Sequence, residues 1–175
     1  GKEGDGFKIT MTAFDHTRPL IASAATGLAK RAMDESIKYA KERTTFGKSI
    51  FQHQAVSFMI ANMAQNIEAA RLLTWQAAWM IDNSIRNTKY AAFAKAFAAD
   101  MCMQVAMDAV QIHGAYGYSD EYPVERFLRN SKGAVIYEGT AEVHTLMQAD
   151  YELGVRKDHP LRCELPAFDP EFWQE

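Results

Sequence analysis

The sequence predicts an all-α fold, specifically an up-down four-helix bundle with an additional short helix. No proline lies between Pro19 and Pro123, so this long stretch lacks the residue that most strongly breaks helices. Within it, apolar residues recur at spacings of three and four, which is the period of an amphipathic helix. No alternation of apolar and polar residues is strong enough to build a sheet. Long helices packed on one another are therefore expected.

Four main helices and a short one are expected. The first opens with a capping side chain near Asp15 to Thr17 and has Pro19 in its first turn, where proline is tolerated. The second carries apolar residues on two faces, so it must lie at the centre of the bundle or at a subunit interface. The expected ranges are 15–43, 52–83, 88–113, 123–131 and a last helix from about residue 140.

The composition indicates a single packed domain. Of the 175 residues, 48% are hydrophobic and 23% are charged, and this length supports one substantial core. A formal net charge of −3 gives no positive field for a nucleic-acid backbone or an anionic membrane surface. No stretch of about 18 apolar residues is free of charge, so no membrane span is expected. Two cysteines are too few for a disulfide framework, which favours a reducing compartment.

The ends of the sequence indicate a piece of a longer protein. Its first residues lack the features of a signal peptide. Because it begins at Gly1 rather than at Met, we expect a fragment or a processed piece, and a targeting segment upstream would not be visible. Three prolines after Gly154 predict an irregular tail over residues 156–175.

Metal and serine chemistry are both disfavoured by residue spacing. The five histidines lack a ligand spacing, and no glutamate is followed three positions later by histidine. No Gly-x-Ser-x-Gly motif occurs either. No metal site is therefore expected.

Glu138 is the best single candidate for acid–base chemistry. It follows the apolar run 134–137 and precedes a helix start at Thr140. Such a setting can desolvate a carboxylate, and desolvation raises a carboxylate pKa towards neutrality, as a general base for a weakly acidic proton requires. A solvated glutamate before an N-cap is the alternative, and spacing alone favours it.

Two basic positions are equally open to two interpretations. Arg18 near a helix start opposes the helix dipole, which an anionic partner or a carbonyl oxygen would offset, and surface solvation explains the residue equally well. Arg43, Thr44 and Thr45 offer a cation and two hydroxyl groups suited to a diphosphate, but such triplets are also common on surfaces.

Six segments in a fixed order carry a family resemblance. They are 6–9 (GFKI), 14–19 (FDHTRP), 39–48 (YAKERTTFGK), 53–55 (HQA), 108–114 (DAVQIHG) and 137–140 (YEGT). Together they resemble the C-terminal helical domain of flavin-dependent acyl-CoA dehydrogenases, with the medium-chain type nearest. The resemblance covers residues 4–155, so we expect one domain over 1–155. Residues 1–14 would then be the end of a missing β-domain or linker.

The resemblance implies a specific reaction. Glu138 matches the base that removes the α-proton of an acyl-CoA thioester while a hydride leaves the β-carbon for the flavin N5. Some members place the base just before the arginine of the first helix, but Thr17 stands there and cannot serve. The residues that the resemblance places at the acyl-CoA substrate are Asp15, His16, Thr17, Arg18 and Gly139.

The resemblance also implies FAD as cofactor, held between subunits. Departures from the family pattern are Gly114-Ala115 in place of Gly-Gly, Ala141 in place of a polar residue, and His144-Thr145 in place of Gln-Arg. The implied cofactor contacts are Arg43, Thr44, Thr45, His53, Gln54, Gln111, Ile112, His113, Gly114, Ala115, Thr140, Ala141 and Glu142.

The implied partners follow from a shared cofactor and an incomplete pocket. We expect a homo-oligomer, commonly a tetramer, that acts in fatty acid metabolism with N-terminal and middle domains missing from this chain. Electron-transfer flavoprotein would be the acceptor, and the site of action would be the mitochondrial matrix or bacterial cytoplasm. Alone, the chain is expected to be inactive. The alternatives are a non-catalytic oligomerisation module, or an oxidase or elimination enzyme on the same fold.

Overall fold

The computed structural model describes residues 1–156, and almost all of the predicted irregular tail lies outside this range. Five α-helices dominate the described part, as the sequence predicts. They are α1 (Gly6–Glu42), α2 (Gln54–Asp82), α3 (Thr88–His113), α4 (Val124–Ile136) and α5 (Ala141–Glu152). The shorter elements are β1 (Thr44–Thr45), β2 (Lys48–Ser49) and the 3₁₀ helices η1 (Ile50–Gln52) and η2 (Gly114–Tyr118).

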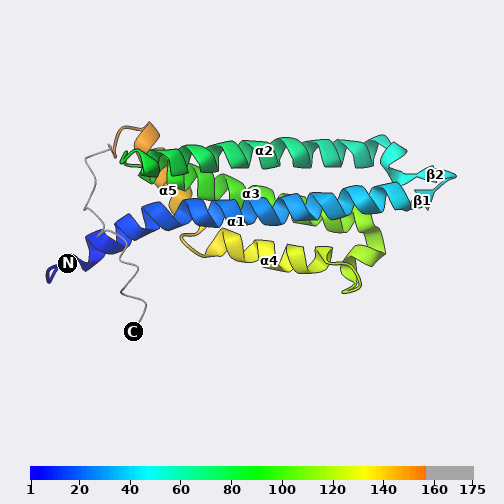
Figure 1. Cartoon of the computed structure of the whole chain (residues 1–175), viewed down its shortest axis with the longest axis horizontal. Coiled ribbons are helices and arrows are strands. Elements are labelled where there is room, and N and C mark those ends of the chain that lie inside the picture. The colour runs from blue at the N-terminus through cyan, green and yellow to red at the C-terminus, as the bar shows by residue number, and fades with distance from the viewer. Residues whose placement is uncertain (157–175) are drawn as a thin grey trace.

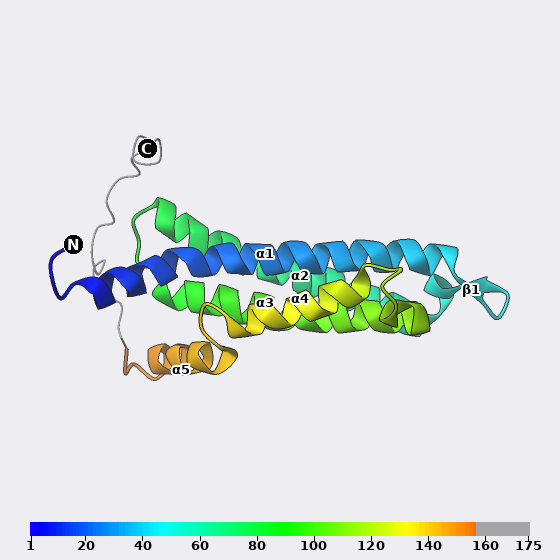
Figure 2. The ribbon, with the colours of Figure 1, turned by 90° about the horizontal axis from the view of Figure 1, so that it is seen from below.

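Helices α1 to α4 run along the long axis of the domain in alternating directions (Figure 1). The helix α3 is central, because it contacts α1, α2, α4 and α5. The last helix, α5, packs against α3 at the end of the bundle where α1 begins (Figure 2). The predicted all-α bundle is therefore confirmed.

Small side chains form the contact between α1 and α3. Five alanines of α1 and seven of α3 are buried, and side chains of α2 such as Met63 and Ile67 fill the remaining space. Alanine lets helix axes approach closely, because its side chain extends only one carbon from the backbone. The buried alanines are Ala22, Ala25, Ala29, Ala32 and Ala40 of α1 and Ala91, Ala92, Ala94, Ala98, Ala99, Ala106 and Ala109 of α3.

The start of the first helix was predicted wrongly. The helix α1 begins at Gly6, nine residues earlier than expected, and Pro19 lies inside it. A proline there cannot donate to the carbonyl four residues earlier, which belongs to Asp15. The side-chain amide of Asn87 donates to that carbonyl at 2.8 Å, so the backbone acceptor is satisfied without the missing N–H. This contact from the segment that leads into α3 cannot be read from local sequence.

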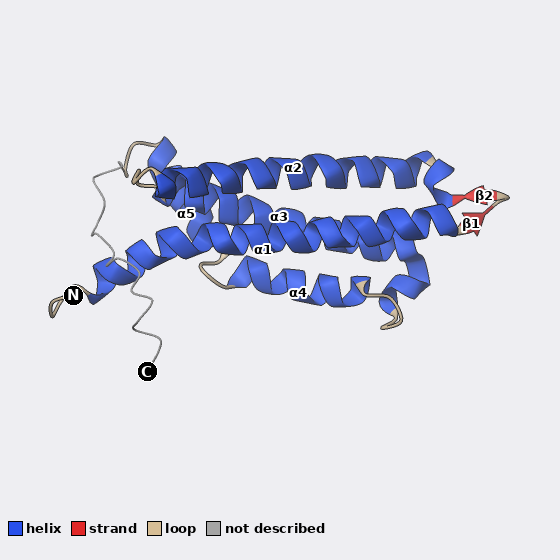
Figure 3. Ribbon diagram, viewed as in Figure 1, coloured by secondary structure: helices blue, strands red, loops and turns tan. Residues whose placement is uncertain are grey.

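Two further boundaries differ. Helix α4 continues to Ile136, five residues beyond the predicted end, so it includes most of the apolar run before Glu138. Residues 44–49 form a small antiparallel hairpin in which Phe46 and Gly47 take positive φ values of 50° and 80°. This is the backbone of a two-residue hairpin turn. The hairpin extends past the end of the bundle (Figure 3).

One face of α2 remains uncovered within the chain. Phe58, Leu72, Trp75 and Trp79 are each more than half exposed. Across residues 1–156, no helix combines the length and the apolar character that crossing a membrane requires.

Enlarging one of the buried alanines at the contact between α1 and α3 should destabilise the bundle. Ala29 is fully buried, so Ala29→Leu is expected to lower the unfolding free energy by about 1–3 kcal/mol through overpacking. Ala24→Leu, on the exposed side of the same helix, is the control. Urea denaturation followed by circular dichroism measures both. Equal stability of the two variants would contradict close packing of α1 on α3.

Candidate active site

The turn between α4 and α5 carries Glu138 in an unusual backbone conformation. Glu138 has a φ of 59° and Gly139 a φ of 102°, and both are half-buried. A left-handed conformation costs a residue with a β-carbon roughly 1–2 kcal/mol. Surrounding contacts must therefore hold this turn in place.

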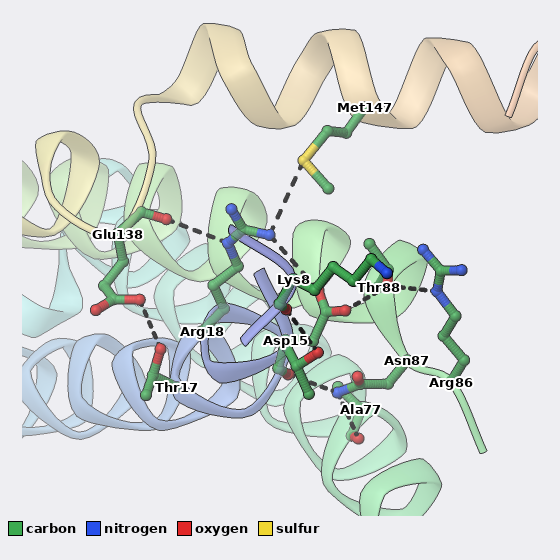
Figure 4. Close-up of polar contacts among 11 residues, drawn as sticks. Lys8, Asp15, Thr17, Arg18, Ala77, Arg86, Asn87, Thr88, Glu138 and Met147 are labelled. Atoms are coloured by element: carbon green, nitrogen blue, oxygen red, sulfur yellow. Dashed lines mark hydrogen bonds and ion pairs between the residues drawn. The ribbon is translucent and has the colours of Figure 1, made fainter. Parts of the chain in front are cut away.

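Two consecutive residues of α1 bind Glu138 from below the turn (Figure 4). The hydroxyl of Thr17 donates to Oε2 of Glu138 at 2.7 Å, and Nε of Arg18 donates to the Glu138 carbonyl at 3.2 Å. Arg18 is buried, and its Nη1 lies 3.9 Å from the sulfur of Met147 on α5. The carboxylate thus has a neutral donor, and a fixed cation lies against its main chain.

Asp15 is buried one turn before Arg18 and links α1 to the start of α3. Its Oδ2 accepts a hydrogen bond from the Thr88 hydroxyl at 2.6 Å, and its Oδ1 lies 3.8 Å from Nη1 of Arg18. The carboxylate offsets the charge of Arg18 and orients its side chain. His16, the remaining predicted residue of this segment, is half-buried on α1.

A cavity of about 670 Å³ opens beside Arg18 and Gly139. Most of its walls are apolar, with three cationic residues among them. Such a lining suits a ligand that is apolar over part of its length and anionic elsewhere. The lining residues are Phe7, Lys8, Met11, Phe14, Arg18, Gly139, Val143, Met147 and Arg156.

Beneath the turn lie Lys95 of α3 and His144 of α5, both almost fully buried. Nζ of Lys95 donates to the Gly139 carbonyl at 2.6 Å. Neither ring nitrogen of His144 has a hydrogen-bond partner within residues 1–156. Burial, reinforced by the charges of Arg18 and Lys95, lowers the pKa of His144 to about 4. The ring is therefore neutral at physiological pH.

The residues predicted for a diphosphate lie at the opposite end of the bundle. Arg43 and Thr44 are exposed, and the Arg43 guanidinium lies 5.9 Å from the centre of the Tyr116 ring. The Thr45 hydroxyl lies 3.2 Å from Nε2 of His53, just before Gln54 opens α2. The structure thus brings these predicted residues together.

The predicted segment 111–115 lies at the same end of the bundle as Arg43, and some of its residues are exposed whereas others are buried. Gln111, Gly114 and Ala115 are exposed, whereas the side chains of Ile112 and His113 face the core. His113 stacks on Tyr39 with ring centres 4.3 Å apart, and its Nδ1 lies 2.8 Å from the Ala109 carbonyl. Burial lowers its pKa.

The predicted cofactor residues therefore form two separate groups. Thr140, Ala141 and Glu142 lie next to Glu138 at the start of α5, whereas Arg43 lies 25 positions beyond Arg18 on the long helix of the chain. At 1.5 Å per residue, that separation is about 38 Å. The two groups of one chain thus lie too far apart to touch the same atoms of a single ligand.

Sequence reasoning missed Lys95, Asn87 and Thr88, which hold the Glu138 turn and Asp15. The available signal was Lys95 itself, a charged residue within the alanine-rich run 91–99 on the apolar face of a helix. Asn87 caps that helix and Thr88 begins it, so both were interpretable only as part of a helix start.

Fold and site together define an all-helical domain in which a strained turn carries the Glu138 carboxylate and borders a largely apolar cavity through Gly139. The family model for the acyl-CoA dehydrogenase C-terminal domain matches residues 4–151, and the chain belongs to this family.

Individual relatives agree with this assignment. An acyl-CoA dehydrogenase of Bacillus subtilis is 46% identical over 154 residues, covering 88% of this chain and 41% of the relative. A caffeyl-CoA reductase-Etf complex subunit of Acetobacterium woodii is 47% identical, covering 84% and 39%. The structure of butyryl-CoA dehydrogenase from Megasphaera elsdenii superposes with a TM-score of 0.86 at 44% identity, covering 87% and 40%. The chain thus spans about two-fifths of the length of these relatives.

The stability of the chain should fall as the pH drops from about 6.5 towards 4. The native pKa of His144, about 4, lies below the ordinary value of 6.5, so in this window the unfolded chain binds more protons than the folded one. The contribution, roughly 3 kcal/mol at most, is complete above this window and lost at its lower end. Urea denaturation across the window measures it.

His144→Gln should flatten this dependence, because glutamine does not titrate. The buried His113 is present in both proteins, so its own titration cancels in the comparison. An unchanged slope would show that His144 is not held neutral in the folded state.

Proposed function

We propose that this chain is the C-terminal domain of an FAD-dependent acyl-CoA dehydrogenase that introduces an α,β double bond into an acyl-CoA thioester, with Glu138 as the base. The observation that carries the proposal is the geometry of the turn at Glu138 and Gly139: Arg18 fixes the Glu138 main chain, Thr17 holds its carboxylate, and Gly139 lines a largely apolar cavity. A thioester carbonyl acidifies its α-carbon, and a half-buried carboxylate is a suitable acceptor for that proton.

Glu138, Arg18 and Gly139 each have a different proposed role around the reacting carbons of the substrate. Glu138 accepts the α-proton at its carboxylate, which Thr17 holds by a single hydrogen bond in the ligand-free site. Arg18 fixes the main chain of Glu138 and places a positive charge beside a developing negative charge on substrate. Gly139 borders the cavity, and glycine is required there because a β-carbon would meet the His144 ring at 3.0 Å. The flavin, when bound, accepts the hydride from the β-carbon.

The exposed groups at the other end suit the cofactor diphosphate. Arg43 provides a guanidinium, and Thr44 and Thr45 provide hydroxyl donors on a hairpin that extends from the bundle. Gln54 and Gln111 lie at the neighbouring helix ends. This donor set fits a dinucleotide whose other half lies against Thr140 to Glu142 of a different subunit.

The proposed assembly is a homo-oligomer completed by N-terminal and middle domains. The Arg43 group lies about 38 Å along α1 from Arg18, which binds the Glu138 turn, so we expect one site to take these two groups from different copies. The uncovered aromatic face of α2, with Trp75 and Trp79, supplies apolar surface for such contacts. We propose a tetramer in which each copy serves its own flavin and a neighbour's.

The proposed electron acceptor is an electron-transfer flavoprotein. The Acetobacterium woodii relative belongs to a caffeyl-CoA reductase-Etf complex, which supports such a partner. The same relative favours a second candidate function, reduction of an α,β-unsaturated acyl-CoA, which uses the reverse of the same chemistry. Flavin oxidation by the unsaturated thioester measures that direction. The bacterial origin of these relatives supports a proposed role in the bacterial metabolism of acyl-CoA compounds.

Glu138→Gln should abolish reduction of the flavin by acyl-CoA while leaving FAD bound. An amide cannot accept the α-proton, so the flavin absorbance should stay unbleached during anaerobic titration of the complete protein. Glu121→Gln, an exposed residue in the loop before α4, is the control. Bleaching of Glu138→Gln at the normal rate would exclude Glu138 as the base. Protein that stays colourless after addition of FAD and the missing domains would indicate a non-catalytic oligomerisation module.

Mixed oligomers should separate the two groups of residues. Glu138→Gln and Arg43→Glu are each expected to inactivate the homo-oligomer. If a flavin site takes Glu138 from one chain and Arg43 from another, a mixed dimer contains one site with both native residues. Activity per mixed dimer should then return to roughly half that of the native dimer. No recovery would mean that Glu138 and Arg43 of the same chain serve the same flavin, so that the chains do not share a cofactor.

A further inference from the structure

Lys95 is a buried charge with no part in the proposed reaction. Its side chain is 1% exposed and stands on α3 among buried alanines. None of the ion pairs found in residues 1–156 includes it. A buried ammonium without a carboxylate partner is costly, and its hydrogen bond to Gly139 is the interaction that offsets this cost.

The bond to Gly139 completes a pair of contacts on successive carbonyls. Arg18, from α1, binds the carbonyl of Glu138, and Lys95, from α3, binds the carbonyl of Gly139. Each carbonyl lies in the plane of the peptide bond that follows it. Fixing both planes fixes the backbone on the C-terminal side of Glu138. The direction of the Glu138 side chain is thereby set relative to two helices.

His144 closes the space into which this turn would otherwise relax. Its Nε2 lies 3.0 Å from the point where a β-carbon on Gly139 would stand, so the ring touches the turn directly. The ring is fully buried on α5 and faces Arg18 and Lys95. Because it is neutral, it packs beside these cations without repelling them.

We propose that Lys95 is a positioning residue for the Glu138 carboxylate, acting through the Gly139 carbonyl against a wall formed by His144. The inference rests on the proposed role of Glu138 as the base. A lysine is suited to this task because its long, flexible stem crosses the apolar wall of α3 and delivers a donor at its tip. Asp100 and Glu138 are the acidic groups whose charges act on Lys95.

Lys95→Met in the complete, FAD-loaded oligomer tests the proposal. Methionine keeps most of the volume but removes the donor, so the carboxylate should lose its alignment with the α-carbon. The limiting rate of flavin reduction should fall roughly 10- to 100-fold, as expected for a misplacement of about 1 Å. The substrate concentration at half-saturation and the FAD content should stay unchanged. An α-deuterated substrate should react with a larger isotope effect than in the native enzyme.

The probe is butyryl-CoA or octanoyl-CoA, whichever bleaches the native flavin faster. Lys89→Met is the matched control, because Lys89 also joins α3 to α5, but through Glu152 near the end of α5, at 2.7 Å. It should leave the rate unchanged. Equal rates for native protein and Lys95→Met, or equal losses for Lys95→Met and Lys89→Met, would overturn the proposal.

A double variant separates positioning from general structural damage. If Lys95 acts through Glu138, adding Lys95→Met to Glu138→Gln should have little further effect on the slow residual reduction. A full additional loss in that background would refute a role through Glu138. Normal reduction by Glu138→Gln alone would instead refute the proposed function, a distinguishable result.

Lys95→Gln serves if the methionine variant does not assemble with FAD. Glutamine is polar enough for the site, but it is too short to reach the Gly139 carbonyl. A slow rate with full FAD content and an enlarged isotope effect is expected. A native rate would overturn the proposal.

Discussion

The close approach of α1 and α3 is the constraint on which the rest of this domain depends. Buried alanines line both helices, so their backbones pack closely over most of their length. Arg18 projects from one of these helices and Lys95 from the other, and both reach the same short turn. If larger side chains separated the helices, neither cation would meet its carbonyl. Core packing and site geometry are thus set by the same contact.

The interior proline shows how the same pair of helices absorbs a local defect. Pro19 leaves the Asp15 carbonyl without its usual helical donor, and Asn87 supplies one from the segment that leads into α3. The next residue, Thr88, binds the carboxylate of the same aspartate. Asp15 is therefore held at both its main chain and its side chain, which keeps Arg18, one turn further along α1, in a fixed orientation.

Much of the architecture could be predicted from sequence because long helices depend on local periodicity. The ranges of α2 and α3 follow from apolar spacing and from the lack of proline. The start of α1 could not be predicted, because the interaction that tolerates Pro19 comes from a residue 72 positions away from Asp15. The extent of α4 was underestimated, since its apolar run 134–136 resembles the approach to a turn as much as the end of a helix.

Some residues of the candidate site could be predicted from the sequence and others could not. Motifs identified Glu138, Arg18 and the Arg43 group, because these residues lie in short contiguous segments. Lys95 and His144 were not identifiable as supports of the turn, since their partners are main-chain carbonyls and a glycine that only the folded chain brings near. Whether a lysine on an apolar helix face is a surface charge or an internal donor depends on the neighbouring helices, which local sequence does not specify.

Helix α1 acts as a rigid spacer between the two ends of the domain. It is continuous from Gly6 to Glu42, so Arg18 and Arg43 are joined by a single helix with no loop to absorb changes in length. Inserting one residue between them would lengthen this spacer by about 1.5 Å and rotate one end against the other by about 100°. The register of this one helix therefore sets both the distance and the relative orientation of the two ends of the domain.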